Sequence, residues 1–470
     1  MLSGRRDFIK GGAFAAAAVA ACGCASSVGG GRSADGAPMR GFRCAPMDKV
    51  RVGVVGVGSR GGAAAKRLAG IAGVEVVAVC DIRPEFAEKA AAEVADVSGT
   101  RPLVFKGGPE EFKRLCGLDV VDVVYVCTSW DAHARVGLYA MDCGKHAMIE
   151  VPSAMTVDEC WALVEKSEAT RRHCMQLENC CYGENELLAL NLCRLGLLGD
   201  ILHGEGGYIH DRRWSIFRGR AYNMWRTHWN IEHAGNQYPT HGLGPIALDM
   251  GINRGDRFDY LVSVDGVQKS YESYAAATLP PGHPGRAQRF AMADMNVTTI
   301  RTALGRTIML QHDVSSARPY SRLNLISGTK GVLRSYPRLE VFIEAADKWP
   351  MTAPEGHHEF NESETERIRR EYMHPLFKSA GEIAVKAGGH GGMDFLMDLR
   401  WVYALRNGLP LDMDVYDLAS WCAVCELTER SARSRSAAVD FPDFTRGAWK
   451  TKCNSYLMDA DIDMSKIYGI

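Results

Sequence analysis

The sequence predicts an α/β chain with two structured parts: a parallel sheet covered by helices on both faces, then an α+β part with a large, mostly antiparallel sheet. Three observations predict this fold class. Between residues 50 and 178, short and nearly continuous apolar runs alternate with helix-like segments. A glycine-rich loop, Gly-Val-Gly-Ser-Arg-Gly at residues 56–61, follows the first run. After about residue 200, strand-like runs follow one another without intervening helices.

Strands and helices alternate along the first part. The expected strands, rich in β-branched residues, are 50–55, 74–80, 120–128, 145–150 and 174–178. The expected helices are 61–72, 84–94, 132–143 and 157–170. Strands that are apolar along their whole length are buried on both faces, so we expect helices on both sides of a parallel sheet.

The second part begins near residue 200. Its expected strands are 206–210, 260–264, 297–304, 307–313, 322–327 and 332–335, and two amphipathic helices, 393–407 and 415–431, follow. Strands in succession favour antiparallel pairing, because parallel neighbours need long crossover connections. We therefore place a first domain at residues 48–180 and a second at 181–470.

The first 24 residues are typical of an export signal. Arg5 and Arg6 precede an apolar run, 11–21, that is too short to span a bilayer. The run ends in Val-Ala-Ala-Cys at Cys22, which is similar to a lipobox, although ordinary cleavage near Cys24 also suits these small residues. We expect export by the twin-arginine route, to the periplasm or as a membrane-anchored lipoprotein, with residues 25–47 as a flexible tether.

The charge and cysteine content narrow the classes of partner. The 55 Lys and Arg residues balance 56 Asp and Glu residues, so there is no basic field to hold nucleic acid. The 15 cysteines are scattered and lack zinc-ligand spacing. We therefore expect buried free thiols and no metal site.

The glycine loop has the context of a dinucleotide-binding Rossmann fold, since a strand precedes it and a helix follows. Gly56 permits the tight turn, Gly58 lets the backbone approach a pyrophosphate, and Gly61 lets the helix pack closely on the strand. Asp81 closes the next strand, twenty residues after Gly61. A carboxylate there accepts hydrogen bonds from the ribose hydroxyls and repels a 2′-phosphate, so the expected cofactor is NAD rather than NADP.

Two further strand ends lie where such a sheet binds its ligand, beyond the carboxyl ends of the strands. They are residues 128–133 and the turn Glu150-Val151-Pro152. We expect Trp130 to pack on the cofactor and His133 to reach the ribose. A capping or packing role for His133 is an equal alternative.

The glycine loop, Asp81, the turn at Glu150 and the segment Ile-Ser-Gly-Thr-Lys-Gly at 326–331 resemble the Gfo/Idh/MocA family of sugar-handling oxidoreductases. In that family the turn usually reads Glu-Lys-Pro, and its lysine assists proton transfer at the oxidised hydroxyl. Here Val151 holds that place. This difference argues against an ordinary sugar dehydrogenase mechanism.

Three longer strings, at residues 178–183, 203–211 and 235–242, resemble glycoside hydrolase family 109. The known activity of that family is α-N-acetylgalactosaminidase. The resemblance implies NAD contacts at Ser59, Arg60, Asp81, Trp130, His133, Glu150, Val151 and Asn179. It implies a sugar pocket lined by Tyr208, Arg226, Tyr238, Pro239, Thr240, His241 and Tyr320, with Tyr238 also near the cofactor.

NAD-dependent glycosidases are exceptions to the usual pair of carboxylates. The expected reaction oxidises C3 of the sugar, removes the proton on C2, eliminates the aglycone, adds water and reduces C3 again, so that NAD is recycled. We expect His241 to be the main acid/base and Tyr238 its partner. Tyr320 would donate a hydrogen bond to the substrate, and Arg226 would hold a substrate oxygen.

Two alternatives keep the fold. One is a sugar or polyol dehydrogenase with dissociable NAD, against which Val151 argues. The other is a non-catalytic sugar-binding lipoprotein, against which the retained Asp81, Tyr238 and His241 argue. The expected partner is a glycan or glycoconjugate, and homo-oligomerisation is expected only by analogy with the family.

Overall fold

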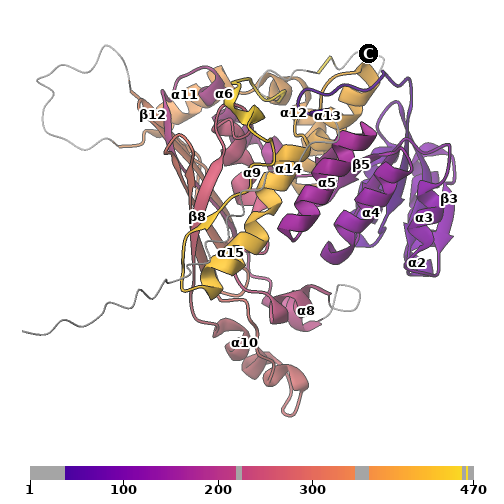
Figure 1. Cartoon of the computed structure of the whole chain (residues 1–470), viewed down its shortest axis with the longest axis horizontal. Coiled ribbons are helices and arrows are strands. Elements are labelled where there is room, and N and C mark those ends of the chain that lie inside the picture. The colour runs from indigo at the N-terminus through magenta and orange to yellow at the C-terminus, as the bar shows by residue number, and fades with distance from the viewer. Residues whose placement is uncertain (1–36, 219–224, 345–358, 458–461, 464–470) are drawn as a thin grey trace, which may run out of the picture. The chain divides into compact units, whose positions relative to one another are not determined.

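A sheet of six parallel strands organises the first half of the computed structural model, which describes residues 37–218, 225–344, 359–457 and 462–463 (Figure 1). The strand order is β3-β2-β1-β4-β5-β6. The strands are Val50–Val55 (β1), Val74–Asp81 (β2), Leu103–Lys106 (β3), Val123–Val126 (β4), His146–Ile149 (β5) and Cys174–Gln176 (β6). The chain order reverses between β1 and β4, which makes a crevice at their carboxyl ends. The expected signal, Cys22 and the start of the tether lie outside the described residues.

Helices connect these strands, as the sequence predicts. They are Ser59–Ala69 (α1), Pro84–Ser98 (α2), Glu111–Cys116 (α3), Trp130–Asp142 (α4) and Val157–Thr170 (α5). Helix α5 begins and ends where expected, because Thr156 and Glu159 form a reciprocal capping box at its start. The sequence analysis missed β3 and α3. Strand β3 has four residues and is partly exposed at the sheet edge, so it carries no continuous apolar run.

An eight-stranded sheet organises the second half, in the order β13-β12-β11-β7-β10-β9-β8-β14. The strands are Ile201–Ile209 (β7), Phe258–Asp265 (β8), Asn296–Thr302 (β9), Thr307–Asp313 (β10), Ser321–Gly328 (β11), Gly331–Arg334 (β12), Glu340–Ile343 (β13) and Val439–Asp440 (β14). Every neighbouring pair is antiparallel except β7 and β10, which are parallel. The expected, mostly antiparallel sheet is therefore confirmed.

The helices of this half are Glu184–Arg194 (α6), Arg213–Arg218 (α7), Trp225–Glu232 (α8), Thr240–Asp249 (α9), Ser270–Thr278 (α10), Glu362–Tyr372 (α11), Pro375–Ala387 (α12), Met393–Asn407 (α13), Val415–Cys422 (α14) and Val424–Arg433 (α15). The expected helix 393–407 is confirmed. The prediction of a single helix over 415–431 is wrong, because the helix is interrupted at Ala423, between α14 and α15. The two pieces serve different partners: α14 packs beside α5 (Figure 1), and α15 packs on β8.

Helix α9 lies directly on β7, and two glycines permit this contact. A Cβ atom on Gly206 of β7 would lie 2.2 Å from the carbonyl oxygen of Gly242 on α9. Such a distance excludes any side chain at Gly206. The contact brings the start of α9, with His241, beside the end of β7, with Tyr208.

The cysteines of the described residues are free, and most of them are buried, as expected. Among the helices that the structure describes, none is both long and apolar enough to cross a membrane.

Candidate active site

The glycine loop exposes an uncapped helix end. Gly56 has a φ of +85°, and a Cβ atom there would lie 2.6 Å from the carbonyl oxygen of Cys127. A Cβ atom on Gly61 would lie 1.9 Å from the carbonyl oxygen of Gly56. Gly58 caps α1 without a side-chain hydrogen bond, and a Cβ atom there would meet nothing nearer than Phe86, at 3.9 Å. The free N–H groups of α1, with Ser59 at its start, fit a diphosphate.

Asp81 lies at the carboxyl end of β2, where an adenosine ribose would lie. Its Oδ1 atom accepts the N–H of Arg83 at 2.9 Å. Burial raises the pKa of this carboxyl, and the main-chain N–H groups of Arg83 and Val57 oppose the rise. The glycine loop and Asp81 together fit NAD.

His133 contacts both the loop after β4, at Thr128, and the loop after β5, at Pro152. Its Nδ1 atom is 2.7 Å from the carbonyl oxygen of Pro152, and its Nε2 atom is 3.0 Å from that of Thr128. Burial lowers the pKa of His133. Because both ring nitrogens face main-chain carbonyls, the structure favours the packing role of His133 over a hydrogen bond to a ribose.

Asp394, at the start of α13, contacts two of the residues expected to contact NAD, Arg60 and Asn179, and Arg60 in turn pairs with a third, Glu150. Arg60 Nη1 lies 2.6 Å from Asp394 Oδ2, and Arg60 Nε lies 2.6 Å from Glu150 Oε1. Asn179 Nδ2 donates to Asp394 Oδ1 at 2.7 Å. Burial would raise the pKa of Asp394, but His390 and Arg60 outweigh it and hold the pKa well below its usual value. Sequence reasoning missed Asp394.

Val151 follows Glu150 and is buried. A valine side chain cannot take or give a proton, so the position that holds lysine in the resembling oxidoreductases has no acid/base function here. Any proton transfer at a sugar hydroxyl must come from another residue.

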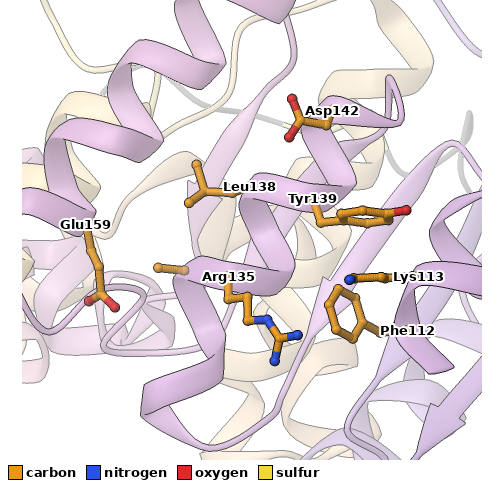
Figure 2. A pocket seen from close by; sticks show the side chains of 8 residues that line it. Phe112, Lys113, Arg135, Leu138, Tyr139, Asp142 and Glu159 are labelled. Carbon is orange, nitrogen blue, oxygen red and sulfur yellow. The ribbon is translucent and has the colours of Figure 1, made fainter. Parts of the chain in front are cut away.

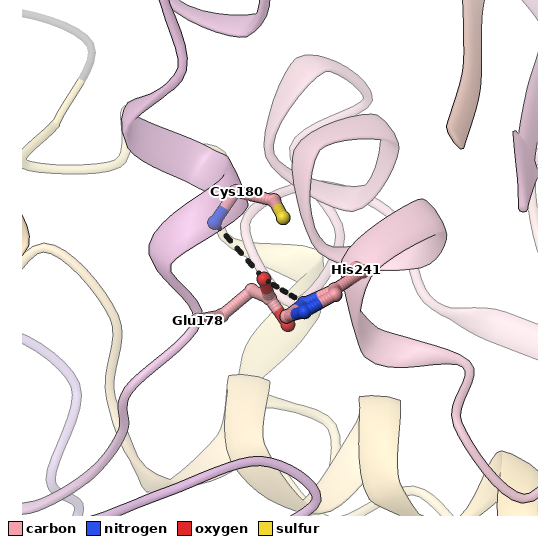
Figure 3. Close-up of side chains that lie close together, drawn as sticks. All are labelled: Glu178, Cys180 and His241. Carbon is pink, nitrogen blue, oxygen red and sulfur yellow. Dashed lines mark hydrogen bonds and ion pairs between the residues drawn. The ribbon is translucent and has the colours of Figure 1, made fainter. Parts of the chain in front are cut away.

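His241 provides such a group, because a buried carboxylate orients it. Its Nδ1 atom lies 2.7 Å from Glu178 Oε1, and its Nε2 atom lies 3.5 Å from the Tyr238 hydroxyl. Figure 3 shows the carboxylate of Glu178, two residues after β6, beside the imidazole of His241 on α9. The main-chain N–H of Cys180 also donates to Glu178 Oε1, at 3.0 Å. This is the carboxylate–histidine arrangement of a general acid/base.

Burial and neighbouring groups determine the protonation states of Glu178 and Tyr238. Burial acts to raise the pKa of Glu178, but His241, Thr240 and the N–H of Cys180 together bring it below its usual value. Glu178 is therefore a carboxylate that accepts the Nδ1 proton of His241. Burial, with Tyr208 nearby, raises the pKa of Tyr238 well above its usual value. Tyr238 is therefore a neutral phenol that donates a hydrogen bond.

The residues expected to line the sugar pocket lie together. The ring of Tyr238 is 4.6 Å from that of Tyr208 and 5.7 Å from that of Trp130, between ring centroids. The Arg226 guanidinium lies 4.7 Å from the Trp130 ring centroid. Tyr320 lies farther out, 6.5 Å from Tyr208. Pro239 caps α9, and Thr240, its first residue, is buried beside Glu178.

Two cavities lie in very different places. The one between the aromatic residues, lined by Trp130, Tyr208, Arg226 and Tyr238 among others, has a volume of about 10 Å³. That volume holds about one water molecule, so the aromatic side chains must move apart to admit a sugar. A larger surface cavity, about 390 Å³, lies over α3, α4 and α5 (Figure 2). It contains none of the expected site residues, whereas four of them line the smaller cavity, so we assign the expected sugar pocket to that cavity; His241 and Glu178 lie outside its lining.

Glu178, Cys180 and His241 place one donor atom each within 4.8 Å of one another, a geometry that a metal ion can use. The sequence analysis expected no metal. Burial raises the pKa of the Cys180 thiol well above its usual value, which disfavours the thiolate that a metal needs. The hydrogen bond between Glu178 and His241 also occupies two of the three donor groups.

Glu178 is the second residue that sequence reasoning missed as a site residue. It opens the string 178–183, which carried the family resemblance, but 63 residues separate it from His241. No periodicity connects two positions so far apart. A buried carboxylate at the end of a parallel strand was the available signal, because ligands bind at that edge of the sheet.

Two family models match this chain. One, described as "Oxidoreductase family, NAD-binding Rossmann fold", matches residues 50–177, and the other, "Glycosyl hydrolase 109, C-terminal domain", matches residues 182–451. A glycosyl hydrolase family 109 protein of Solibacter usitatus is 43% identical over 452 residues, which cover 95% of this chain and 98% of that protein. One of Shewanella pealeana is 43% identical over 426 residues, covering 89% and 91%.

Solved structures share the fold. Levoglucosan dehydrogenase in complex with NADH and levoglucosan has a TM-score of 0.61 and 19% identity, covering 84% of this chain and 100% of that one. Myo-inositol dehydrogenase from Lactobacillus casei, in complex with NAD(H) and myo-inositol, has a TM-score of 0.54 and 16% identity, covering 84% and 99%. At this identity, the likeness concerns the fold alone.

Proposed function

Because the chain belongs to glycosyl hydrolase family 109, we propose that it is an NAD-dependent glycosidase that cleaves α-N-acetylgalactosaminides. The observation that carries this proposal is the Glu178–His241–Tyr238 chain of contacts, in a protein whose NAD-binding half has Val151 where the related oxidoreductases have lysine. The acid/base function is thereby assigned to α9 rather than to the turn after β5.

Glu178, His241 and Tyr238 have distinct functions in the proposed reaction. NAD, when bound, supplies reversible oxidation at C3 of the sugar. His241 receives the proton of the C3 hydroxyl on Nε2, since Nδ1 donates to Glu178. The Glu178 carboxylate then stabilises the imidazolium. Tyr238, as a neutral phenol, donates to a sugar oxygen beside Nε2.

The oxidation matters because of its effect on the neighbouring carbon. A ketone at C3 acidifies the proton on C2; a second base takes that proton, and the aglycone leaves from C1 with a proton in its place. Water then adds across C1 and C2, with its hydroxyl on C1 and its proton on C2. As C3 is reduced again, His241 returns its proton to the C3 oxygen. In this scheme the cofactor ends each turnover in its starting state, so no external oxidant is consumed.

One assay tests the proposal. The purified protein is incubated with a chromogenic α-N-acetylgalactosaminide without added NAD. Release of the chromophore without accumulation of NADH supports the glycosidase. Stoichiometric NADH supports a dehydrogenase, and tight sugar binding without turnover supports a non-catalytic sugar-binding protein.

A second test concerns His241. The variant His241→Ala is expected to lose about 10²–10⁴-fold in turnover, the usual contribution of a positioned acid/base, while it keeps its NAD. Unchanged turnover would remove His241 from the mechanism. Loss of NAD together with turnover would show that the histidine serves binding instead.

We also propose that the protein is exported by the twin-arginine route, to the periplasm or as a lipoprotein anchored through Cys22. The proposal rests on Arg5, Arg6 and the apolar run before Cys22. Replacing both arginines with lysine should retain the protein in the cytoplasm of the producing cell. Replacing Cys22 with alanine should abolish labelling by a fatty-acid probe. Labelling of the Cys22→Ala variant would rule out this anchor.

A further inference from the structure

Two arginines line the cavity between the aromatic residues without a carboxylate partner. Arg212 precedes α7, and Arg226 lies in the first turn of α8. Arg212 Nε is buried and has no hydrogen-bond acceptor. Throughout the part of the chain that the structure describes, neither guanidinium makes an ion pair; Arg226 instead lies over the rings of Trp130 and Tyr238.

No other residue of the cavity supplies a negative charge. The lining consists of Trp130, Tyr208, Arg212, Ile216, Arg226, Asn230, Tyr238, Met292, His312 and Val314. Nearby carboxylates have other partners: Asp211 pairs with Arg213 at 2.6 Å, and Asp313 accepts main-chain N–H groups of Ser315 and Ser316. The sequence that connects α7 to α8, residues 219–224, contains no Asp or Glu.

Burial, assisted by the two guanidinium groups, also keeps the neighbouring histidines neutral. Burial, with Arg226, lowers the pKa of His312 to about 3. Burial, with Arg212 and Arg226, lowers the pKa of His210 to about 4. Burial and Arg226 also lower the pKa of Arg212. The residues that line the cavity therefore include two partly buried cations and no anion, an arrangement that the counter-charge of a ligand would stabilise.

We propose that Arg212 and Arg226 form an anion-recognition subsite, and that the preferred substrates carry a sulfate ester or a carboxylate on the sugar bound there. This inference rests on the proposed function, since it names the class of sugar that the glycosidase accepts. The planar forks of two guanidinium groups match the oxygens of such a group. The rings of Tyr208 and Tyr238 offer faces for the sugar itself.

The test compares O-sulfated and unsubstituted chromogenic α-N-acetylgalactosaminides, together with a galacturonide as the carboxylate probe. In the wild type, kcat/KM is expected to be higher for an anionic substrate than for the neutral one. Arg212→Gln should reduce this preference about tenfold, the amount that one charge-assisted hydrogen bond supplies. Arg213→Gln is the matched control, because Arg213 already pairs with Asp211; it should leave the preference unchanged. A preference for only one of the two anionic substrates would show whether the subsite binds a sulfate ester or a carboxylate.

Equal kcat/KM values for anionic and neutral substrates in the wild type would overturn the inference. An equal loss on both substrates in Arg212→Gln would do the same. Release of NAD from Arg212→Gln would instead assign the arginine to the cofactor. If no substrate is hydrolysed, the proposed function fails, and the subsite is then judged by calorimetric binding of the sulfated sugar to the NAD-loaded wild type and Arg212→Gln. Equal affinities there would overturn it independently.

Discussion

The variant Glu178→Gln tests the acid/base assignment most directly. The substitution keeps the size of the side chain but removes the charge that lies 2.7 Å from His241 Nδ1. The Glu178 side chain is fully buried, so water cannot replace that charge. A hydrogen bond to a charged group contributes about 1.5–3 kcal/mol and a neutral one about 0.5–1.5 kcal/mol. The protonated form of His241 therefore loses about 1–2 kcal/mol of stabilisation, which predicts a kcat lower by about 5–30-fold.

The assay measures kcat on the chromogenic substrate and, in parallel, the NAD released when the protein is denatured. NAD content should equal that of the wild type, because Glu178 contacts His241 rather than the glycine loop. Glu429→Gln is the matched control: Glu429 Oε2 lies 2.9 Å from His233 Nδ1, outside the proposed mechanism. A kcat for Glu178→Gln within twofold of the wild type would refute the assignment. So would a loss of kcat that merely follows a loss of NAD.

Three further outcomes are expected. Gly61→Ala places a Cβ atom 1.9 Å from a main-chain oxygen and should lower the free energy of unfolding by about 1–3 kcal/mol. Gly58→Ala has room for its Cβ atom, so it should leave the urea midpoint unchanged and reduce NAD retention instead. Asp394→Asn removes one of the two carboxylates that pair with the partly buried Arg60, and it should lower the free energy of unfolding, measured in urea, by about 3–5 kcal/mol. An unchanged urea midpoint would show that Glu150 alone is enough to stabilise the charge of Arg60. Glu178 has a lowered pKa in the folded state, so its ionised form contributes stability above its unfolded pKa of about 4.3. That stability disappears as the pH falls through the folded pKa, and Glu178→Gln should therefore lose less stability on acidification than the wild type.

Local patterns predicted the first half of the chain well. Strand 50–55 is exact because it is short, β-branched and bounded by a glycine turn, and helix 157–170 is exact because its cap is encoded in adjacent residues. The break at Ala423 was not predictable in the same way. Alanine favours a helix, and the interruption follows from α14 and α15 packing on different elements.

The sequence predicted which residues form the site better than it predicted the contacts between them. Tyr208, Tyr238 and His241 were named from the family resemblance, and the structure brings them together. Glu178 and Asp394 were not named. Each acts through a residue more than sixty positions away, so only the folded chain puts the two partners side by side.

The centre of the second sheet has a consequence for how the chain folds. Strand β7 pairs only with β10 and β11, whose residues come about a hundred positions later. Closing loops of that length costs entropy before any pairing repays it, which slows folding. Tyr208 lies on β7, so its part of the candidate site can gain both neighbouring strands only after the chain has emerged as far as β11. A fragment that ends before residue 307 would hold the glycine loop but would leave β7 with both edges unpaired and open to aggregation.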